Sequence, residues 1–330
     1  MEYNKLKIIL KTIIFLLFLC TNSIYAQKDT ITIGAYIKSL YDFNLTDNSY
    51  KTEFWVWIKS NKNSTLDSLP NQIEFINAKT SPQIEAASTT SSKGKLNWYG
   101  AKYIAEFQKN WDVTSFPFDK QKLKIVIESG KYNSNQIFFK CDFKNSKLND
   151  SIKYNINEWT IIKSRFYVDI SKYDTTFGDP DLKSNSSYPS FNFEVFLVRK
   201  DPYLVLFKLI TGLLVAFIIS CCVFFIKPTN TDPRFGLSVG GLFAAIGNKY
   251  IIESKVPTTN QNTLLDNIHN LTFIYILLIT ILSVISLYYY EKKTSKNRKK
   301  SKLIDKISFI LIFSTYFLFL YLIIFSKSRL

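Results

Sequence analysis

Histidine and cysteine are scarce in this chain of 330 residues, which contains one histidine and four cysteines. Because His269 is the only histidine and no cysteine pair lies in a loop, the sequence offers no Cys/His metal site and no Ser-His-Asp or Cys-His catalytic set. It also lacks a glycine-rich loop that would hold a phosphate. We therefore predict no enzymatic activity, no metal and no cofactor, and we interpret His269 as an ordinary interfacial residue.

The few cysteines also limit the use of disulfides. Cys221 and Cys222 are adjacent inside a long apolar run, where they act as small apolar side chains. An exported domain in which Cys141 is the only cysteine has no internal disulfide, so packing alone has to stabilise it.

The N-terminus has the pattern of a secretory signal. Lysines precede an apolar run that ends at Cys20, and the stretch TNSIYAQ places the small residue Ala26 at a cleavage position. We expect residues 1–26 to be a cleaved signal peptide, and the alternative is a retained membrane anchor. Lipidation of Cys20 is not expected because Leu19, directly before it, is not small.

The segment 27–200 is polar, and its apolar residues alternate with polar ones. In TEFWVWIKS, KLKIVIES and SFNFEVFLVRK, every second residue is apolar, which is typical of half-buried strands. Turn-forming stretches such as LTDNS and SSKGK separate these runs, and no helical pattern interrupts them. The predicted fold of this segment is an all-β sandwich of about ten strands.

After residue 200 the composition changes to long apolar runs that can cross a bilayer as helices. One segment, residues 233–257, is less apolar than the others because it contains glycines, Asn248, Lys249 and Glu253. Charged residues are costly in lipid, so we expect neighbouring helices to shield it. The four predicted membrane helices are 203–226, 234–254, 271–290 and 303–325.

The formal net charge of +16 would suit a nucleic-acid partner, but the basic residues are not spread over a soluble fold. The densest basic cluster, EKKTSKNRKKSKLIDK at 291–306, lies between the last two apolar runs. Placed as a cytoplasmic loop it satisfies the positive-inside rule, and four crossings then put 27–200 outside. We therefore predict a multi-pass protein with 201–330 among membrane lipids and no nucleic-acid partner.

Motifs along the chain occur in the order found in one family of membrane receptors. FPFDKQKL is similar to that family's loop signature Phe/Tyr-Pro-Phe-Asp-x-Gln. NEWTI at 157–161 is similar to the Glu-Trp that opens the family's ninth strand. Arg199 matches the basic residue before the family's first helix. From Arg234 to Pro257 the spacing is that of the pore helix and the loop after it. The chain thus resembles the pentameric ligand-gated ion channels, or Cys-loop receptors, over 31–325.

The resemblance implies a homopentamer in the inner membrane of a bacterium, with a periplasmic sandwich that binds a ligand and opens a pore for ions. The family's disulfide positions are Lys109 and Leu123 here, so the chain is similar to prokaryotic members without that bridge. The implied ligand is a small molecule such as an amine, a proton or a divalent ion. The alternatives are a non-conducting receptor of the same architecture and an enzyme with a membrane anchor.

The resemblance also assigns the residues that face the pore. The implied pore-lining positions are Gly236, Gly240, Phe243, Gly247, Ile251 and Ser254. A ring of Phe243 side chains would close such a pore by dewetting. Alternatively, Gly236, Gly240, Ala244 and Asn248 follow each other at intervals of four residues, a pattern typical of close helix packing without ion flow.

Charges near the two ends of this helix give opposing indications of selectivity. Asp232 at the cytoplasmic mouth and Glu253 at the outer mouth favour cations, whereas Arg234, Lys249 and Lys255 oppose them. We interpret the balance as favouring cations.

The loop that contains FPFDKQKL is expected to couple the sandwich to the pore. Its apolar tip would press on the helices, and Asp119 would pair with Arg199 behind the tip. The alternative is a hydrophobic turn that Asp119 merely caps. The implied coupling residues are Phe116, Pro117, Phe118, Asp119, Arg199 and Pro257.

The family binds its ligands in an aromatic cleft between neighbouring sandwiches. The matching positions on one face are Glu74, Phe75, Tyr132, Tyr173, Phe177 and Tyr188, and those on the opposite face are Trp57, Trp98 and Tyr99. Aromatic faces with a carboxylate suit an amine through cation–π contact. Aromatic residues make up 16% of the chain, so any segment would offer some of them.

Overall fold

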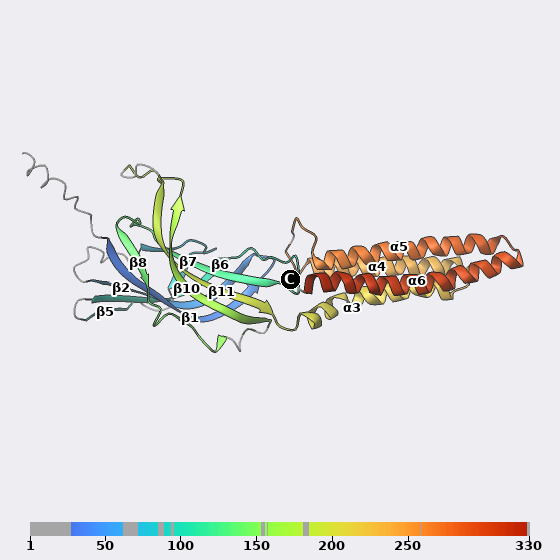
Figure 1. The fold of residues 1–330 in the computed structure, drawn as a ribbon, viewed down its shortest axis with the longest axis horizontal. Coiled ribbons are helices and arrows are strands. Elements are labelled where there is room, and N and C mark those ends of the chain that lie inside the picture. Colours follow the sequence, from blue (N-terminus) through green and yellow to red (C-terminus); the bar gives the residue numbers. More distant parts are fainter. Residues whose placement is uncertain are drawn as a thin grey trace, which may run out of the picture.

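The computed structural model describes residues 28–61, 72–84, 89–93, 96–152, 156, 158–180, 185–257 and 259–328. Strands come first and helices follow, and the two parts lie end to end (Figure 1). This confirms the predicted fold class, a β-sandwich followed by four apolar helices. The expected signal peptide lies outside the described residues.

The larger sheet has the strand order β4-β6-β2-β1-β8, with β5 paired to β6 and β9 paired to β1. Its strands are β1 (Asp29–Asn44), β2 (Ser49–Asn61), β4 (Gln83–Ile84), β5 (Thr89–Lys93), β6 (Leu96–Gln108), β8 (Ile137–Cys141) and β9 (Lys147–Leu148). The pairs β1–β2 and β2–β6 are antiparallel, whereas β1 and β8 are parallel.

The smaller sheet has the order β10-β11-β7-β3, and all of its pairs are antiparallel. Its strands are β3 (Ile73–Phe75), β7 (Lys120–Ser129), β10 (Trp159–Tyr173) and β11 (Ser186–Arg199). β10 and β11 form a long hairpin that projects from the sandwich (Figure 1).

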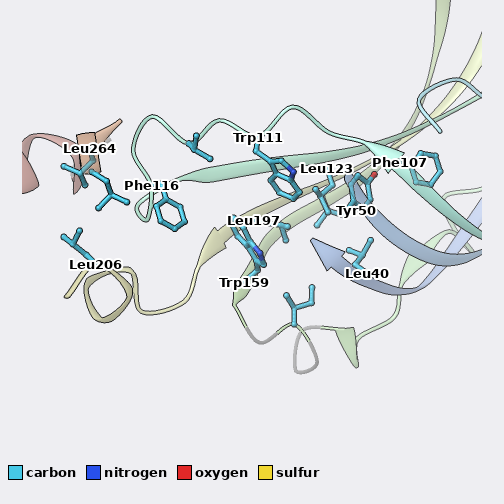
Figure 2. Close-up of a cluster of buried hydrophobic side chains, with 14 of the residues drawn as sticks. Leu40, Tyr50, Phe107, Trp111, Phe116, Leu123, Trp159, Leu197, Leu206 and Leu264 are labelled. Carbon is cyan, nitrogen blue, oxygen red and sulfur yellow. The ribbon is translucent and has the colours of Figure 1, made fainter. Parts of the chain in front are cut away.

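Buried side chains of both sheets face each other, as the alternation in the sequence predicts. Phe54 and Val56 of β2 and Ile125 and Ile127 of β7 belong to one hydrophobic core. That core continues beyond the sandwich into the helices. Figure 2 shows Phe116 between the sandwich residues and the helix residues of this cluster.

The helical part contains four helices that are long and apolar enough to cross a membrane. They are α3 (Pro202–Cys221), which continues as the 3-10 helix η2 (Cys222–Phe225), α4 (Thr231–Glu253), α5 (Leu264–Glu291) and α6 (Ser295–Ser328). α5 begins earlier than expected because Thr263 and Asp266 form a capping box at its N-terminus.

The expected basic loop 291–306 is largely helical. α6 begins at Ser295 and runs without a break to Ser328, so only a short turn separates it from α5. Lysine and arginine are good helix formers, and hydropathy therefore detects only the apolar part of this helix. The start of the last helix, which the sequence analysis predicts at residue 303, is therefore corrected to Ser295.

Small residues bring α4 close to α3. A Cβ at Gly241 would overlap the hydroxyl of Ser220 and lie 2.9 Å from the carbonyl oxygen of Ala216. The buried face of α4 consists of Arg234, Ser238, Gly241, Ala245 and Ile252. Close packing of helices through small residues thus occurs on this face of α4.

Candidate ligand cavity, coupling junction and pore face

A cavity of about 410 Å³ lies where the β10–β11 hairpin meets the ends of β3 and β7. The residues around it come from three distant parts of the sequence. Two are acidic and three are aromatic, and the others are Ile76, Ser129 and Gly130. The acidic and aromatic residues are Glu74, Glu128, Tyr173, Phe177 and Tyr188.

Three aromatic rings form the hairpin side of this cavity. The ring centroid of Tyr173 lies 5.3 Å from that of Phe177 and 6.1 Å from that of Tyr188, in edge-to-face arrangements. Such arrangements stabilise aromatic clusters. The cluster holds the hairpin in one shape around the cavity.

Two carboxylates, Glu74 and Glu128, face the rings across the cavity. Glu128 is only 3% exposed and accepts hydrogen bonds from the hydroxyls of Ser171 and of Tyr173, the latter at 2.8 Å. Burial and the hydrogen bond to Glu128 raise the pKa of Tyr173 to about 12, so this hydroxyl remains a donor. A Cβ at Gly130 would lie 2.7 Å from Cδ of Glu74, so the carboxylate of Glu74 packs directly against this glycine.

Glu128 was not predicted from the sequence. The signal was present, since Glu128 is the second-last residue of the stretch KLKIVIES and lies on the side opposite Leu123, Ile125 and Ile127. An acid at the end of an alternating strand is therefore worth testing as a site residue.

Two of the predicted cavity residues lie elsewhere. Phe75 packs in the sandwich core, with its ring centroid 5.0 Å from Tyr103 and 5.6 Å from Phe54. Neighbouring residues of a strand point to opposite faces, so Phe75 turns inward where Glu74 turns to the cavity. Tyr132 is half-buried against the core and does not line the cavity. Phe75 is thus a correction to the expected set, while the role expected for Tyr132 stays a prediction.

The residues predicted for the opposite face lie on the larger sheet. The indole N–H of Trp57 donates to Asp142 at 3.1 Å, and a Cβ at Gly34 would lie 2.6 Å from the Trp57 ring. Trp98 lies against Gly100 in the same way, whereas Tyr99 packs against the core. None of these residues reaches the described cavity of its own chain.

Asp142 fixes Trp57 through a buried network. Its carboxylate also accepts hydrogen bonds from Lys59 at 2.7 Å and from Asn145 at 2.9 Å. Burial alone would raise the pKa of Asp142, but the hydrogen bonds from Lys59, Asn145 and Trp57 outweigh it and lower the pKa to about 2. Asp142 is therefore a carboxylate at every physiological pH.

At the junction of the two parts, Asp119 and Arg199 form a buried ion pair. Nε of Arg199 lies 2.7 Å from Oδ1 of Asp119, and Gln121 donates to the other carboxylate oxygen at 2.8 Å. The guanidinium carbon lies 4.2 Å from the ring centroid of Trp159 and 4.5 Å from that of Phe116. The expected pair is thus present, while a role in gating is a proposal.

The tip of the same loop contacts the helices. The ring of Phe118 lies 4.9 Å from that of Tyr203, at the start of α3. The backbone N–H of Leu264, at the start of α5, donates to the carbonyl oxygen of Thr114 at 3.1 Å. Phe116 and Pro257 line a cavity of about 270 Å³ beside the end of α4. The loop therefore touches or adjoins three helices.

One face of α4, continued by its C-cap Ser254, is exposed in the described chain. We call it the pore face, and its residues are all exposed: Gly236, Gly240, Phe243, Gly247, Ile251 and Ser254. At about 100° per residue, this set is centred about 150° from the buried face. Phe243 is 68% exposed, and no heavy atom of the described chain lies within 4 Å of a Cβ built at Gly236, Gly240 or Gly247.

The alternative packing hypothesis fits the single chain poorly. Gly236 and Gly240 lie on the pore face and meet no other element of the described chain, so any helix that they contact belongs to another copy. Asn248 does contact neighbours, since it donates to the carbonyl oxygen of Leu209 at 3.2 Å and lies 3.1 Å from Nε2 of His269.

The charges at the ends of α4 differ from the sequence-based expectation. Asp232 is exposed, but Arg234 is 2% exposed and bonds to Asp305 of α6 at 2.6 Å, as well as to the carbonyl oxygen of Ile226. The expectation that Arg234 adds positive charge to the mouth is therefore wrong. At the other end, Glu253 lies 3.6 Å from Lys249.

No model of a known protein family matches the chain. Over 207 residues it is 26% identical to the neuronal acetylcholine receptor subunit alpha-2 of Gallus gallus, which covers 62% of this chain and 36% of that relative. Over 189 residues it is 25% identical to the acetylcholine receptor subunit beta-type unc-29 of Caenorhabditis elegans, covering 57% and 34%. Over 192 residues it is 23% identical to the neuronal acetylcholine receptor subunit alpha-9 of Gallus gallus, covering 58% and 37%.

The chain spans about a third of the length of these relatives. The matches agree with the sandwich and the four apolar helices, an arrangement that matches the architecture of Cys-loop receptors. At low identity, the chain is thus similar to subunits of acetylcholine receptors.

Proposed function

We propose that the chain is a subunit of a homopentameric ligand-gated ion channel in the inner membrane of a bacterium, with 27–200 in the periplasm. The observation that carries this proposal is the pore face of α4. Its six positions are exposed in the described chain, while the opposite face packs on α3, α5 and α6. Five copies around an axis would bring these faces together and leave a water-filled path.

The ligand would bind between the cavity of one subunit and the Trp57 face of the next. Aromatic rings attract a cation by about 0.5–2 kcal/mol each, and Glu74 and Glu128 add negative charge beside the rings. We therefore infer a cationic amine as the ligand class. A divalent ion or a proton acting on the same carboxylates is the other choice.

Cations are the ions that the charges of α4 favour. The exposed carboxylate of Asp232 lies near the pore face, whereas the charge of Arg234 is neutralised inside the bundle by Asp305. Glu253 contributes less because Lys249 lies close to it. In the first turn of α4, the exposed charge is therefore that of Asp232, although Lys227 in the turn before α4 is exposed as well.

Opening would follow from movement at the junction. A ligand that draws the β10–β11 hairpin toward the cavity moves β11, and β11 ends at Arg199, directly before α3. Arg199 is bonded to Asp119 in the loop that contacts α3 and α5. A displacement of the hairpin would thus reach the helices through side chains that are in direct contact.

Purified protein in planar bilayers tests the proposal. Current is recorded while primary and quaternary amines, pH steps and calcium removal are applied, and the reversal potential is measured in a sodium chloride gradient. We expect amine-evoked current that reverses near the sodium equilibrium potential. Amine binding without any current would overturn conduction and leave a non-conducting receptor, and electron micrographs of monomers or dimers would overturn the pentamer.

A further inference from the structure

The end of the bundle remote from the sandwich is a rigid helical hairpin. α6 contains 34 residues, so at 1.5 Å per residue it is about 50 Å long. The hydrocarbon core of a bilayer is about 30 Å thick. The first turns of α6 therefore extend beyond the hydrocarbon as helix, and their side chains have fixed directions.

Two contacts fix the rotation of this part of α6. The hydroxyls of Ser301 and Ser286 lie 2.9 Å apart, and one turn later Asp305 is bonded to the buried Arg234 of α4. Ser301 and Asp305 thus face the bundle. The opposite face of the helix carries exposed apolar residues, among them Leu303, Ile307 and Ile310, and this face meets lipid.

The lipid-facing side of α6 changes from apolar to cationic within one turn. Lys300, Lys299 and Lys296 precede Leu303 by three, four and seven residues, so they continue the same face. All three side chains are exposed. Cations in this position lie at the depth of the lipid headgroups and face the bilayer.

Tyrosines of α5 lie beside these cations. Nζ of Lys300 lies 4.1 Å from the ring centroid of Tyr289, and Nζ of Lys292 lies 4.5 Å from that of Tyr288. Tyrosine is enriched at the boundary between hydrocarbon and water. The tyrosine rings and the lysine ammonium groups therefore both indicate that this part of the hairpin lies at the boundary between hydrocarbon and water.

The local charge is almost entirely positive. In the described segment 288–306 the acids are Glu291 and Asp305, and Asp305 is buried against Arg234. Only Glu291 therefore opposes the exposed lysines and arginine of this segment.

We propose that this surface binds the phosphate groups of anionic phospholipids in the leaflet remote from the sandwich. We call it the basic face, and its residues are Tyr288, Tyr289, Lys292, Lys296, Lys299 and Lys300. Each lysine or arginine near an anionic membrane surface strengthens binding by about fivefold. A merely solvated loop would not place its cations on the continuation of a lipid-facing side.

The test uses the full chain in detergent micelles. Native mass spectrometry measures the affinity for phosphatidylglycerol and for phosphatidylcholine. The variant K296Q/K299Q/K300Q removes three charges from the basic face. K293Q/R298Q/K302Q is the matched control. It also removes three positive charges, from exposed positions of the segment 288–306 that lie outside the basic face.

We expect the first variant to weaken phosphatidylglycerol binding about a hundredfold without changing phosphatidylcholine binding, and the control to change phosphatidylglycerol binding less than about twofold. K296R/K299R/K300R should retain the wild-type affinity, which separates lost charge from a folding defect. An equal loss in both triple variants, or no loss in the first, would overturn the proposal. Inorganic phosphate is the second probe, and phosphate that displaces the lipid at equal concentration would mean a free-anion site instead.

Discussion

Nε of Arg199 lies 2.7 Å from Oδ1 of Asp119, and both side chains are buried between the sandwich and the first helix. Trp159 and Phe116 place their rings beside the same guanidinium. Because little water reaches the pair, removing one partner leaves the other charge uncompensated. The pair joins the loop before β7 to the end of β11, so it ties the contact loop to the strand that enters α3.

Asp119→Asn is expected to leave surface expression intact and to shift or abolish ligand-evoked current. The substitution removes the charge that holds Arg199, and breaking a buried pair costs roughly 3–5 kcal/mol. Surface labelling and current recording in oocytes measure the two effects separately. Asp112→Asn is the control, because Asp112 lies in the same loop with its side chain exposed, and unaltered responses in Asp119→Asn would reject the coupling role.

Cysteines on the pore face should react with a cationic thiol reagent applied in water while the channel is open. In a Cys222→Ser background, Phe243→Cys and Gly247→Cys should be modified at least about tenfold faster than Ala245→Cys, because Ala245 packs against the bundle. The measurement is the rate at which the reagent alters current. Equal rates at all three positions would mean that α4 is oriented differently.

Asp232→Asn should reduce the preference for sodium over chloride more than Glu253→Gln does. Asp232 is exposed, whereas Glu253 already lies 3.6 Å from Lys249, so removing its charge changes the local field less. Reversal potentials in a sodium chloride gradient measure both. A larger shift in Glu253→Gln would move the selective charge to the outer mouth.

Asp142 should give a pH-dependent contribution to stability. Its pKa falls from an ordinary 3.8 to about 2 in the folded chain, so its stabilisation is complete above about pH 4 and is lost as the pH falls toward 2. At neutral pH, Asp142→Asn should therefore lower the free energy of unfolding by about 2 kcal/mol. Thermal unfolding in detergent should show this difference shrinking below pH 4.

The control for this experiment is Asp169→Asn. Asp169 is exposed on β10, and surface substitutions of this kind change stability by less than about 0.5 kcal/mol. If the deficit of Asp142→Asn stayed constant down to pH 2, the network with Lys59 and Trp57 would not be the source of the stabilisation.

Arg234→Ala should destabilise the helix bundle strongly, because it leaves Asp305 buried without a partner. The expected loss is about 3–5 kcal/mol. Replacing the pair by apolar residues, in Arg234→Met/Asp305→Leu, should recover most of it. Size-exclusion chromatography after heating measures the surviving fraction. A double variant that is as unstable as Arg234→Ala alone would show that the ion pair is not the main cause.

Local patterns in the sequence were sufficient for the architecture. The alternation at Leu123, Ile125 and Ile127 predicted a buried face that the structure contains, and apolar length predicted the helices. The same patterns misplaced the start of α6, because they detect burial and not helix propensity. The capping pair Thr263 and Asp266 could have located the start of α5.

Side-chain partners were harder to predict because they depend on tertiary contacts. Arg234 and Asp305 are 71 residues apart, and no local pattern joins them. The resemblance supplied the pairing of Asp119 with Arg199 but not Glu128, whose partners Ser171 and Tyr173 come from β10 of the same sheet. Phe75 was misassigned because the motif gave its position along the strand but not its side.

The pore face also has a functional consequence. Its six positions are exposed in the described chain and lie opposite the buried Gly241 and Ala245, so exchanging them does not disturb the packing around those two residues. In the proposed channel, an exchange at these positions would alter the wall of the ion path while the folding of the subunit stays nearly unchanged. Conduction and stability would thus be controlled from opposite sides of one helix.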